Sequence, residues 1–144
     1  AFKPSKTLVK NIIFICFAAI TISYGVVHGA FVAIATSSKL AIQNNLDLNE
    51  SILLASEANN ALRLLVYPIF GLLSVLFIYQ VWKKNTLYPR WIILFFPLIP
   101  FLIQDFICKN LSGNIWIIVC GGYLNHILII FFTASTIALW NKKT

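Results

Sequence analysis

The sequence predicts an all-α membrane protein in which four transmembrane helices form a bundle, with the N and C termini in the cytoplasm. Of the 144 residues, 60% are hydrophobic and 10% are charged, whereas a soluble domain carries about 25% charged residues. The apolar residues gather in four long runs, and most basic residues lie beside alternate ends of these runs. A chain this short cannot bury so much apolar surface in a water-soluble core, so it needs lipid as a second solvent.

Each apolar run is expected to cross the membrane as one helix, and residues 1–144 are expected to form a single transmembrane domain. A helix rises about 1.5 Å per residue and the hydrocarbon layer is about 30 Å thick, so a span takes about 20 residues. Strands are not expected, because these runs lack the alternating pattern of a membrane barrel. The expected spans are residues 12–35, 62–82, 91–107 and 115–140.

Polar residues separate the first two runs and predict where the second helix begins. Thr36, Ser37 and Ser38 end the first apolar run, and Lys39 follows them. The second helix is expected to begin outside the membrane near residue 49, where Asp47 or Asn49 can serve as the N-cap.

Three prolines and a glycine pair interrupt the later runs. Pro68 lies in the second run, and Pro97 and Pro100 lie in the third. Each proline removes a helical hydrogen bond, and the freed carbonyl can line an ion site or belong to a simple kink. Gly121 and Gly122 in the fourth run allow close packing or a local bend.

The basic residues predict the orientation, because basic segments mark the cytoplasmic side of a membrane protein. They indicate a multi-pass protein of the cell membrane. A nucleic-acid partner is not expected despite the net charge of +7, because the basic residues flank apolar runs and form no stripe. The residues expected inside are Lys3, Lys6, Lys10, Lys83, Lys84, Arg90, Lys142 and Lys143.

Two histidines predict a polar site inside the bundle. His28 in the first run and His126 in the fourth fall at similar depths in the outer half of the membrane when the helical rise is applied. Ionisable groups at this depth are costly and usually face a bundle interior. Asn60, Arg63 and Asn125 are expected to complete a ligand-binding site with the two histidines. The alternative is that each histidine is neutral and bonds a neighbouring helix.

The carboxylates near this depth have two candidate roles. Glu57 or Asp105 can supply the counter-charge that Arg63 needs near the apolar boundary, although Arg63 can also extend to the interface. Together with His28 and His126, the same two carboxylates are the candidate catalytic acids and bases. Two histidines on separate helices with no ligand motif are weak grounds for a metal site, so no metal and no cofactor are expected.

Small residues on the first helix predict a packing face. Gly25, Gly29 and Ala33 recur every four residues, which lets another helix approach closely. The approaching helix can belong to this chain, to a second copy or to another membrane protein.

The three cysteines leave one pairing open. Cys108 and Cys120 are both expected toward the outer side, where an oxidising compartment would allow a disulfide. Cys16 is expected toward the inner side, and none of the three belongs to a metal-binding spacing.

The segment Tyr88-Pro89-Arg90-Trp91 begins the third run, and three further features accompany it: His28-Gly29 late in the first run, the pair Gly121-Gly122, and Asn125. With these motifs the chain, from about residue 12 to residue 140, resembles a family of uncharacterised bacterial multi-pass membrane proteins. The resemblance implies a half-length member or a fragment, because that family has additional helices before the counterpart of Ala1. The resemblance implies a bacterial inner membrane as the location and supplies no reaction.

The physical interpretation of the same motif is simpler. Pro89 suits the first turn of a helix, Arg90 can bind a lipid phosphate, and Trp91 anchors at the interface. Without a catalytic signature, the sequence favours binding of membrane lipids or a small hydrophobic ligand, or the role of an accessory membrane subunit. The alternative is a small membrane-embedded enzyme that acts on a lipid or sterol-like substrate by histidine and carboxylate acid–base chemistry.

Overall fold

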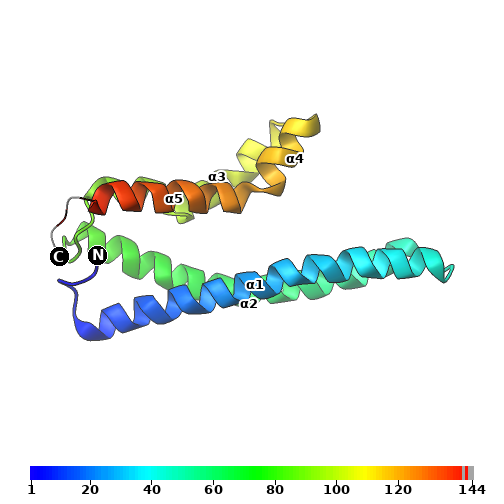
Figure 1. Cartoon of the computed structure of the whole chain (residues 1–144), viewed down its shortest axis with the longest axis horizontal. Helices are drawn as coiled ribbons and strands as arrows, with labels where there is room; N and C mark the ends of the chain where they lie inside the picture. The colour runs from blue at the N-terminus through cyan, green and yellow to red at the C-terminus, as the bar shows by residue number, and fades with distance from the viewer. Residues whose placement is uncertain (141, 143–144) are drawn as a thin grey trace. The chain divides into compact units, whose positions relative to one another are not determined.

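The computed structural model describes residues 1–140 and residue 142, except the side chain of Ile117. Every regular element among these residues is helical, which confirms the all-α class (Figure 1). The elements are α1 (Thr7–Gln43), α2 (Leu48–Trp82), the 3-10 helix η1 (Arg90–Phe95), α3 (Leu98–Lys109), α4 (Gly113–Gly121) and α5 (Tyr123–Leu139).

The chain divides into two compact units. The first, here called the hairpin unit, is Asn11–Val75 and holds most of α1 and α2. The second, here called the aromatic unit, combines Ala1–Lys10 with Leu76–Thr144. The expectation of a single domain stays a prediction, and each unit is described by itself.

Two helices, α1 with 37 residues and α2 with 35, are long and apolar enough to cross a membrane. At about 1.5 Å per residue each measures more than 50 Å, so each exceeds the roughly 30 Å of the hydrocarbon layer. The pair α4 and α5 makes a third crossing if its two bent halves belong to one span.

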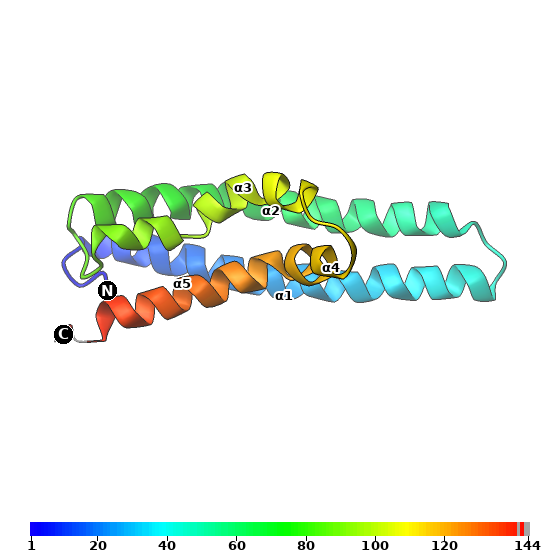
Figure 2. The same cartoon turned by 90° about the horizontal axis from the view of Figure 1, so that it is seen from above.

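In the hairpin unit, α1 and α2 run antiparallel and are joined by a short turn at residues 44–47 (Figure 2). Asn59, Val66 and Leu73 of α2 are buried at seven-residue intervals. On α1, Ile13 and Val27 are buried two such intervals apart, and Ala41 continues the series. A seven-residue period keeps one seam of each helix turned toward its partner, as in coiled coils.

α1 continues beyond Thr36–Ser38, the polar residues that end the first apolar run. The Ser37 and Ser38 hydroxyls donate to the Ile34 carbonyl at 2.9 and 2.8 Å and are satisfied within the helix. The N-cap of α2 is Asp47, whose Oδ1 accepts the Glu50 N–H at 3.0 Å. The start of α2 at Leu48 agrees with the expected extension to about residue 49.

The third run, expected as one helix over residues 91–107, is broken. η1 ends at Phe95, Phe96 is extended with φ −67° and ψ 135°, and α3 begins at Leu98. The break follows from Pro97, since a residue before proline avoids the helical region. The Phe96 and Ile99 N–H groups donate to the Ile93 and Phe96 carbonyls at 3.1 and 3.2 Å. The carbonyls freed by Pro97 and Pro100 therefore have protein partners.

The fourth run, expected as one helix over residues 115–140, is also broken. Gly122 separates α4 from α5 with φ −104° and ψ 10°, and the two helices are bent by 56°. In contrast, α2 continues through Pro68 without interruption. The glycine pair therefore produces a bend, whereas the proline of the second run does not end its helix.

An aromatic cluster forms the core of the aromatic unit. Phe77 is 1% exposed and stacks on Phe96 with ring centroids 4.4 Å apart. Phe131 of α5 meets both rings edge-on at 5.7 and 5.5 Å. Phe2 and Tyr88 reach the Phe77 ring at 5.8 and 5.6 Å. This cluster joins the end of α2, η1, α5 and the first residues of the chain.

A disulfide closes the opposite end of the aromatic unit. Cys108 of α3 is bonded to Cys120 of α4, and their Cα atoms are 5.9 Å apart, within the range that a disulfide can bridge. This bond settles the pairing that the sequence leaves open. Cys16 is buried and free.

Candidate functional site

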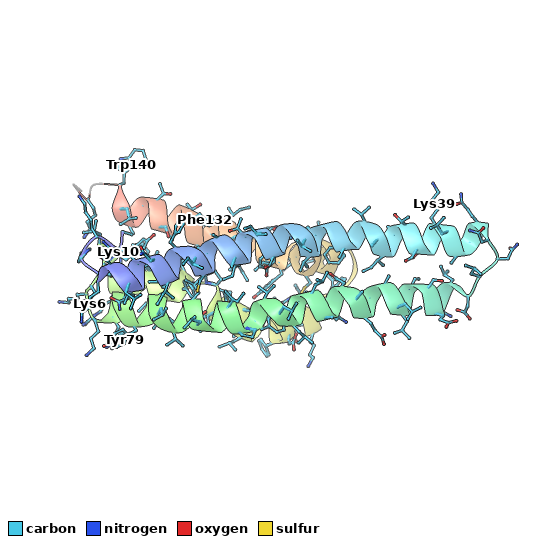
Figure 3. The ribbon with its side chains drawn as sticks, turned by 90° about the horizontal axis from the view of Figure 1, so that it is seen from below. Lys6, Lys10, Lys39, Tyr79, Phe132 and Trp140 are labelled. Carbon is cyan, nitrogen blue, oxygen red and sulfur yellow. A yellow bond between two sulfur atoms is a disulfide. The ribbon has the colours of Figure 1, made fainter. Side chains whose placement is uncertain are left out.

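One end of the aromatic unit, here called the basic end, gathers positive charge. It carries seven of the eleven Lys and Arg residues and none of the four acidic residues. Figure 3 shows Lys6 and Lys10 at this end together with Tyr79 and Trp140. The seven residues are Lys3, Lys6, Lys10, Lys83, Lys84, Arg90 and Lys142.

The backbone at the end of α2 places a lysine where glycine is usual. Lys84 adopts φ 58°, and its N–H donates to the Val81 carbonyl at 3.1 Å. The Asn85 N–H reaches back to the Gln80 carbonyl at 2.9 Å. These two bonds form the Schellman arrangement, whose left-handed residue is usually glycine. A side chain in that conformation costs about 1–2 kcal/mol, so the chain retains a charged residue against its local backbone preference.

Arg90 is held in place by Trp82. Its Nε donates to the Trp82 carbonyl at 3.2 Å, and its guanidinium lies over the Trp82 ring, 5.1 Å from the centroid. The cation therefore satisfies a carbonyl at the C-terminus of α2, where positive charge is favourable. Arg90 is also exposed, so a planar donor group is oriented at the surface before any ligand arrives.

Aromatic residues surround these cations. The Lys83 ammonium lies 5.9 Å from the centroid of the Tyr79 ring. Trp82 and Trp91 are 59% and 42% exposed. Exposed tryptophan beside basic residues is typical of a membrane–water interface, so the basic end can meet headgroups and the start of the acyl chains together.

The first residues of the chain hold the turn that carries Lys83 and Lys84. The buried Ser5 hydroxyl lies 2.6 Å from the Asn85 carbonyl and 3.2 Å from Gln80 Oε1. The Ala1 carbonyl accepts the Leu87 N–H at 2.8 Å. The sequence interpretation missed Ser5 and Gln80. Gln80 continues the seven-residue series of Asn59, Val66 and Leu73, and that spacing was the available signal.

The structure places His28 on an exposed edge of the hairpin unit. Its Nδ1 lies 2.8 Å from the Tyr24 carbonyl, and its ring is 5.9 Å from the Tyr24 ring and 6.3 Å from the Phe31 ring. Residues 22–26 of α1 face residues 62–65 of α2 across a groove, which places Tyr24 at the level of Arg63. The sequence interpretation missed Tyr24, which lies one helical turn from His28.

The other candidates of the hairpin unit point outward. Asn60 and Glu57 are exposed, whereas the neighbouring Asn59 is 4% exposed. Asn59 Oδ1 has no hydrogen-bond partner among the described residues. Within the same part of the chain, no carboxylate lies within 4.0 Å of the Arg63 guanidinium.

His126 belongs to the aromatic unit and lies against the bend between α4 and α5. A Cβ added at Gly122 would come within 2.9 Å of His126 Cε1, so the glycine leaves room for the imidazole. Asn125 and Asp105 are exposed. The shared site of His28 and His126, and the acid–base roles of Glu57 and Asp105, stay predictions. Among the described residues, no three His, Cys, Asp or Glu side chains gather around a metal position.

The small-residue face of α1 has no intrachain neighbour in the part of the chain that the structure describes. A Cβ added at Gly25 or Gly29 would meet nothing within 4 Å, and Ala33 is exposed. The packing partner predicted from this spacing stays a prediction.

An apolar groove lies on the hairpin unit between α1 and α2. Its volume is about 220 Å³, below the 300–1,000 Å³ of typical small-molecule sites. The groove suits a segment of acyl chain better than a compact ligand. Its lining residues are Ile22, Ser23, Val26, Leu62 and Leu65.

No protein-family model, curated protein or solved structure matches this chain. The resemblance to a bacterial multi-pass family therefore stays a prediction, and the function has to be argued from the residues.

Proposed function

We propose that this chain is a multi-pass membrane protein of the bacterial inner membrane that binds an anionic phospholipid at its basic end, without catalysing a reaction. The observation that carries the proposal is the exposed Arg90 guanidinium, which Trp82 fixes by stacking and by a hydrogen bond of 3.2 Å. Lys83 and Lys84 lie on the same turn, and the basic end contains no acidic residue.

The lengths of the helices support four crossings. α1 and α2 each exceed a span, and α4 with α5 contains 26 residues over two bent halves. The six residues of η1 rise about 12 Å and the twelve of α3 about 18 Å, which together reach the hydrocarbon thickness. Four crossings return both termini to one side.

Two independent features support an orientation with the basic end in the cytoplasm. Basic residues favour the cytoplasmic side. The Cys108–Cys120 disulfide closes the opposite end of the aromatic unit, and disulfides persist in oxidising compartments such as the periplasm. Cysteine substituted at Asn44, in the turn between α1 and α2, should react with an impermeant reagent from outside, whereas cysteine at Asn85 should not. The reverse pattern would contradict the orientation.

The chemistry of the basic end fits a phosphate ester. Phosphate oxygens accept charge-assisted hydrogen bonds from a planar guanidinium and from ammonium groups. The exposed rings of Trp82 and Trp91 suit the region where headgroup meets acyl chain. Basic segments beside a span gain about 1 kcal/mol per Lys or Arg at an anionic surface, and Arg90 adds orientation to this general attraction.

The test is lipid binding by the whole chain in nanodiscs of phosphatidylcholine with and without phosphatidylglycerol. Arg90→Gln should weaken phosphatidylglycerol binding roughly tenfold, as expected for losing a hydrogen bond to a charged group. Lys39→Gln removes one exposed charge from the hairpin unit instead and is the matched control. Equal binding by wild type and Arg90→Gln would refute the proposed site.

A further inference from the structure

A second cation lies near an apolar boundary, and the residues that the structure describes place no counter-ion beside it. Arg63 occupies the first turn of the second apolar run and is exposed. Glu57 precedes it by six residues, a spacing that does not bring two side chains together on a helix. Among the described residues, no carboxylate oxygen comes within 4.0 Å of the Arg63 guanidinium. Ionisable groups at this depth usually have a partner, and a lipid phosphate at the interface that Arg63 can reach supplies one.

The neighbours of Arg63 on the hairpin unit form a polar edge. Residues 22–26 of α1 face residues 62–65 of α2 across the apolar groove, so Tyr24 and Arg63 lie at the same level of the two helices. The Tyr24 ring in turn contacts the His28 ring at 5.9 Å. One cation, one phenol and one imidazole from two helices are therefore linked along this edge.

The hydrogen bond of His28 fixes what its ring can offer. The Tyr24 carbonyl can only accept, and it lies 2.8 Å from His28 Nδ1, so Nδ1 carries the hydrogen. In the neutral ring Nε2 is then an acceptor. The edge thus combines donors for an anion, from Arg63 and Tyr24, with an acceptor for a hydroxyl group.

The geometry points to a second lipid site on this edge, where Arg63 and Tyr24 donate to the phosphate of an anionic phospholipid and His28 accepts from a headgroup hydroxyl. A phosphatidylglycerol-type headgroup supplies both groups on one ligand. The site is separate from Arg90 and does not rest on lipid binding at the basic end. In the proposed orientation the site faces the outer leaflet, because Arg63 lies at the outer end of the second run. The rest of that run extends from Arg63 through nearly a full membrane thickness toward the inner side.

The experiment measures bound phosphatidylglycerol for the full chain in phosphatidylcholine nanodiscs. Arg63→Gln should weaken one class of bound phosphatidylglycerol roughly tenfold while the class lost in Arg90→Gln remains. The double variant should lose both classes. Lys39→Gln, which removes an exposed charge from the same unit (Figure 3), should leave both classes intact.

The proposed role of His28 predicts a preference between two anionic lipids, and loss of a charge alone would not change that preference. At the site that contains Arg63, wild type should prefer phosphatidylglycerol to phosphatidic acid, because phosphatidic acid lacks the hydroxyl groups of the glycerol headgroup. His28→Phe should abolish this preference and retain the binding of either lipid. Tyr24→Phe should weaken the binding of both lipids.

Three outcomes would overturn the inference. The first is unchanged phosphatidylglycerol binding in Arg63→Gln. The second is an equal loss in Arg63→Gln and Lys39→Gln, which would indicate general attraction by the surface. The third is displacement of the Arg63 class by inorganic phosphate, which would assign the site to a soluble anion. Failure of Arg90→Gln alone would contradict the proposed function and leave this site standing.

Discussion

The two ends at which α1 and α2 stop have the same backbone arrangement and very different surroundings. Asn45, after α1, has φ 52°, and Lys84, after α2, has φ 58°. In both, the next N–H reaches back to a carbonyl five residues earlier at 2.9 Å, from Leu46 to Ala41 and from Asn85 to Gln80. One local motif therefore ends both long helices.

The partners of the two turns differ. The turn at residues 44–47 is completed by its own neighbour Asp47, which caps α2 at 3.0 Å. The turn after α2 is held by Ser5 and the Ala1 carbonyl, which lie about 80 residues away along the chain. The first turn is a product of local sequence, and the second depends on tertiary contacts. The position of Lys83 and Lys84 therefore depends on residues at the start of the chain.

The largest effect is expected where the aromatic core supports the end of α2. Phe77→Ala would remove a ring that is 1% exposed and contacts Phe2, Tyr88, Phe96 and Phe131. Truncating a buried phenylalanine costs about 3–5 kcal/mol. Thermal unfolding in detergent should show this loss.

The control for Phe77→Ala is Phe132→Ala on α5. Phe132 also lies in an aromatic pair, 5.6 Å from Phe131, but it is 55% exposed. Its truncation should lower the unfolding temperature much less. Equal losses for the two variants would show that the cluster around Phe77 is no more important than a lipid-facing ring.

A smaller effect is expected from the hydrogen bonds that fix the turn after α2. Ser5→Ala removes the donor to the Asn85 carbonyl and leaves the buried Gln80 with fewer partners. An unsatisfied buried polar group costs about 1–3 kcal/mol. Hydrogen exchange at the Leu87 amide, which donates to Ala1, should accelerate. Unchanged protection at Leu87 would show that the first residues do not hold the turn.

The fold could be predicted from sequence where the signal is local and long. Hydropathy predicted the two helices that are long enough to cross a membrane, and Asp47 was recognised as a candidate cap. The breaks at Phe96–Pro97 and Gly122 were left open, because proline and glycine in membrane helices are compatible with both continuous and broken helices. Pro68 and Pro97 show both outcomes in one chain.

The sequence allowed single residues of the candidate site at the basic end to be named, but it did not predict how these residues lie relative to one another. Arg90 was expected from its position beside Pro89 and Trp91 to be able to bind a lipid phosphate, and this stays a prediction. Its stacking on Trp82, eight residues earlier, depends on the turn between them. That turn is fixed by Ser5, and no periodic pattern links Ser5 to the turn. His28 and Arg63 were named from the sequence, whereas Tyr24, whose ring and carbonyl contact the His28 ring, was not.

The turn at residues 44–47 should respond only locally. Asp47→Ala removes the acceptor for the Glu50 N–H, and loss of an N-cap costs about 0.5–2 kcal/mol. Hydrogen exchange should rise at Glu50 and at Ser51, whose N–H donates to the Asp47 carbonyl at 3.2 Å. Protection at Leu87 should not change. A change at both turns would contradict the view that this one is closed by its neighbours alone.

The smallest expected change in stability tests whether Lys84 is kept for its charge. Glycine adopts a positive φ without the side-chain penalty of about 1–2 kcal/mol. It loses more conformational entropy on folding, however, which costs about 0.5–1 kcal/mol. Lys84→Gly should therefore raise the free energy of unfolding by about 0.5–1 kcal/mol and weaken phosphatidylglycerol binding at the basic end. Asn45→Gly is the matched control, since asparagine already tolerates this conformation, and it should change neither quantity appreciably. Opposite signs for stability and binding at Lys84 would mark a residue retained against its backbone preference for the sake of the ligand. If Lys84→Gly bound phosphatidylglycerol like wild type, Lys84 would not belong to the site and Arg90 would have to be supported by Lys83 alone.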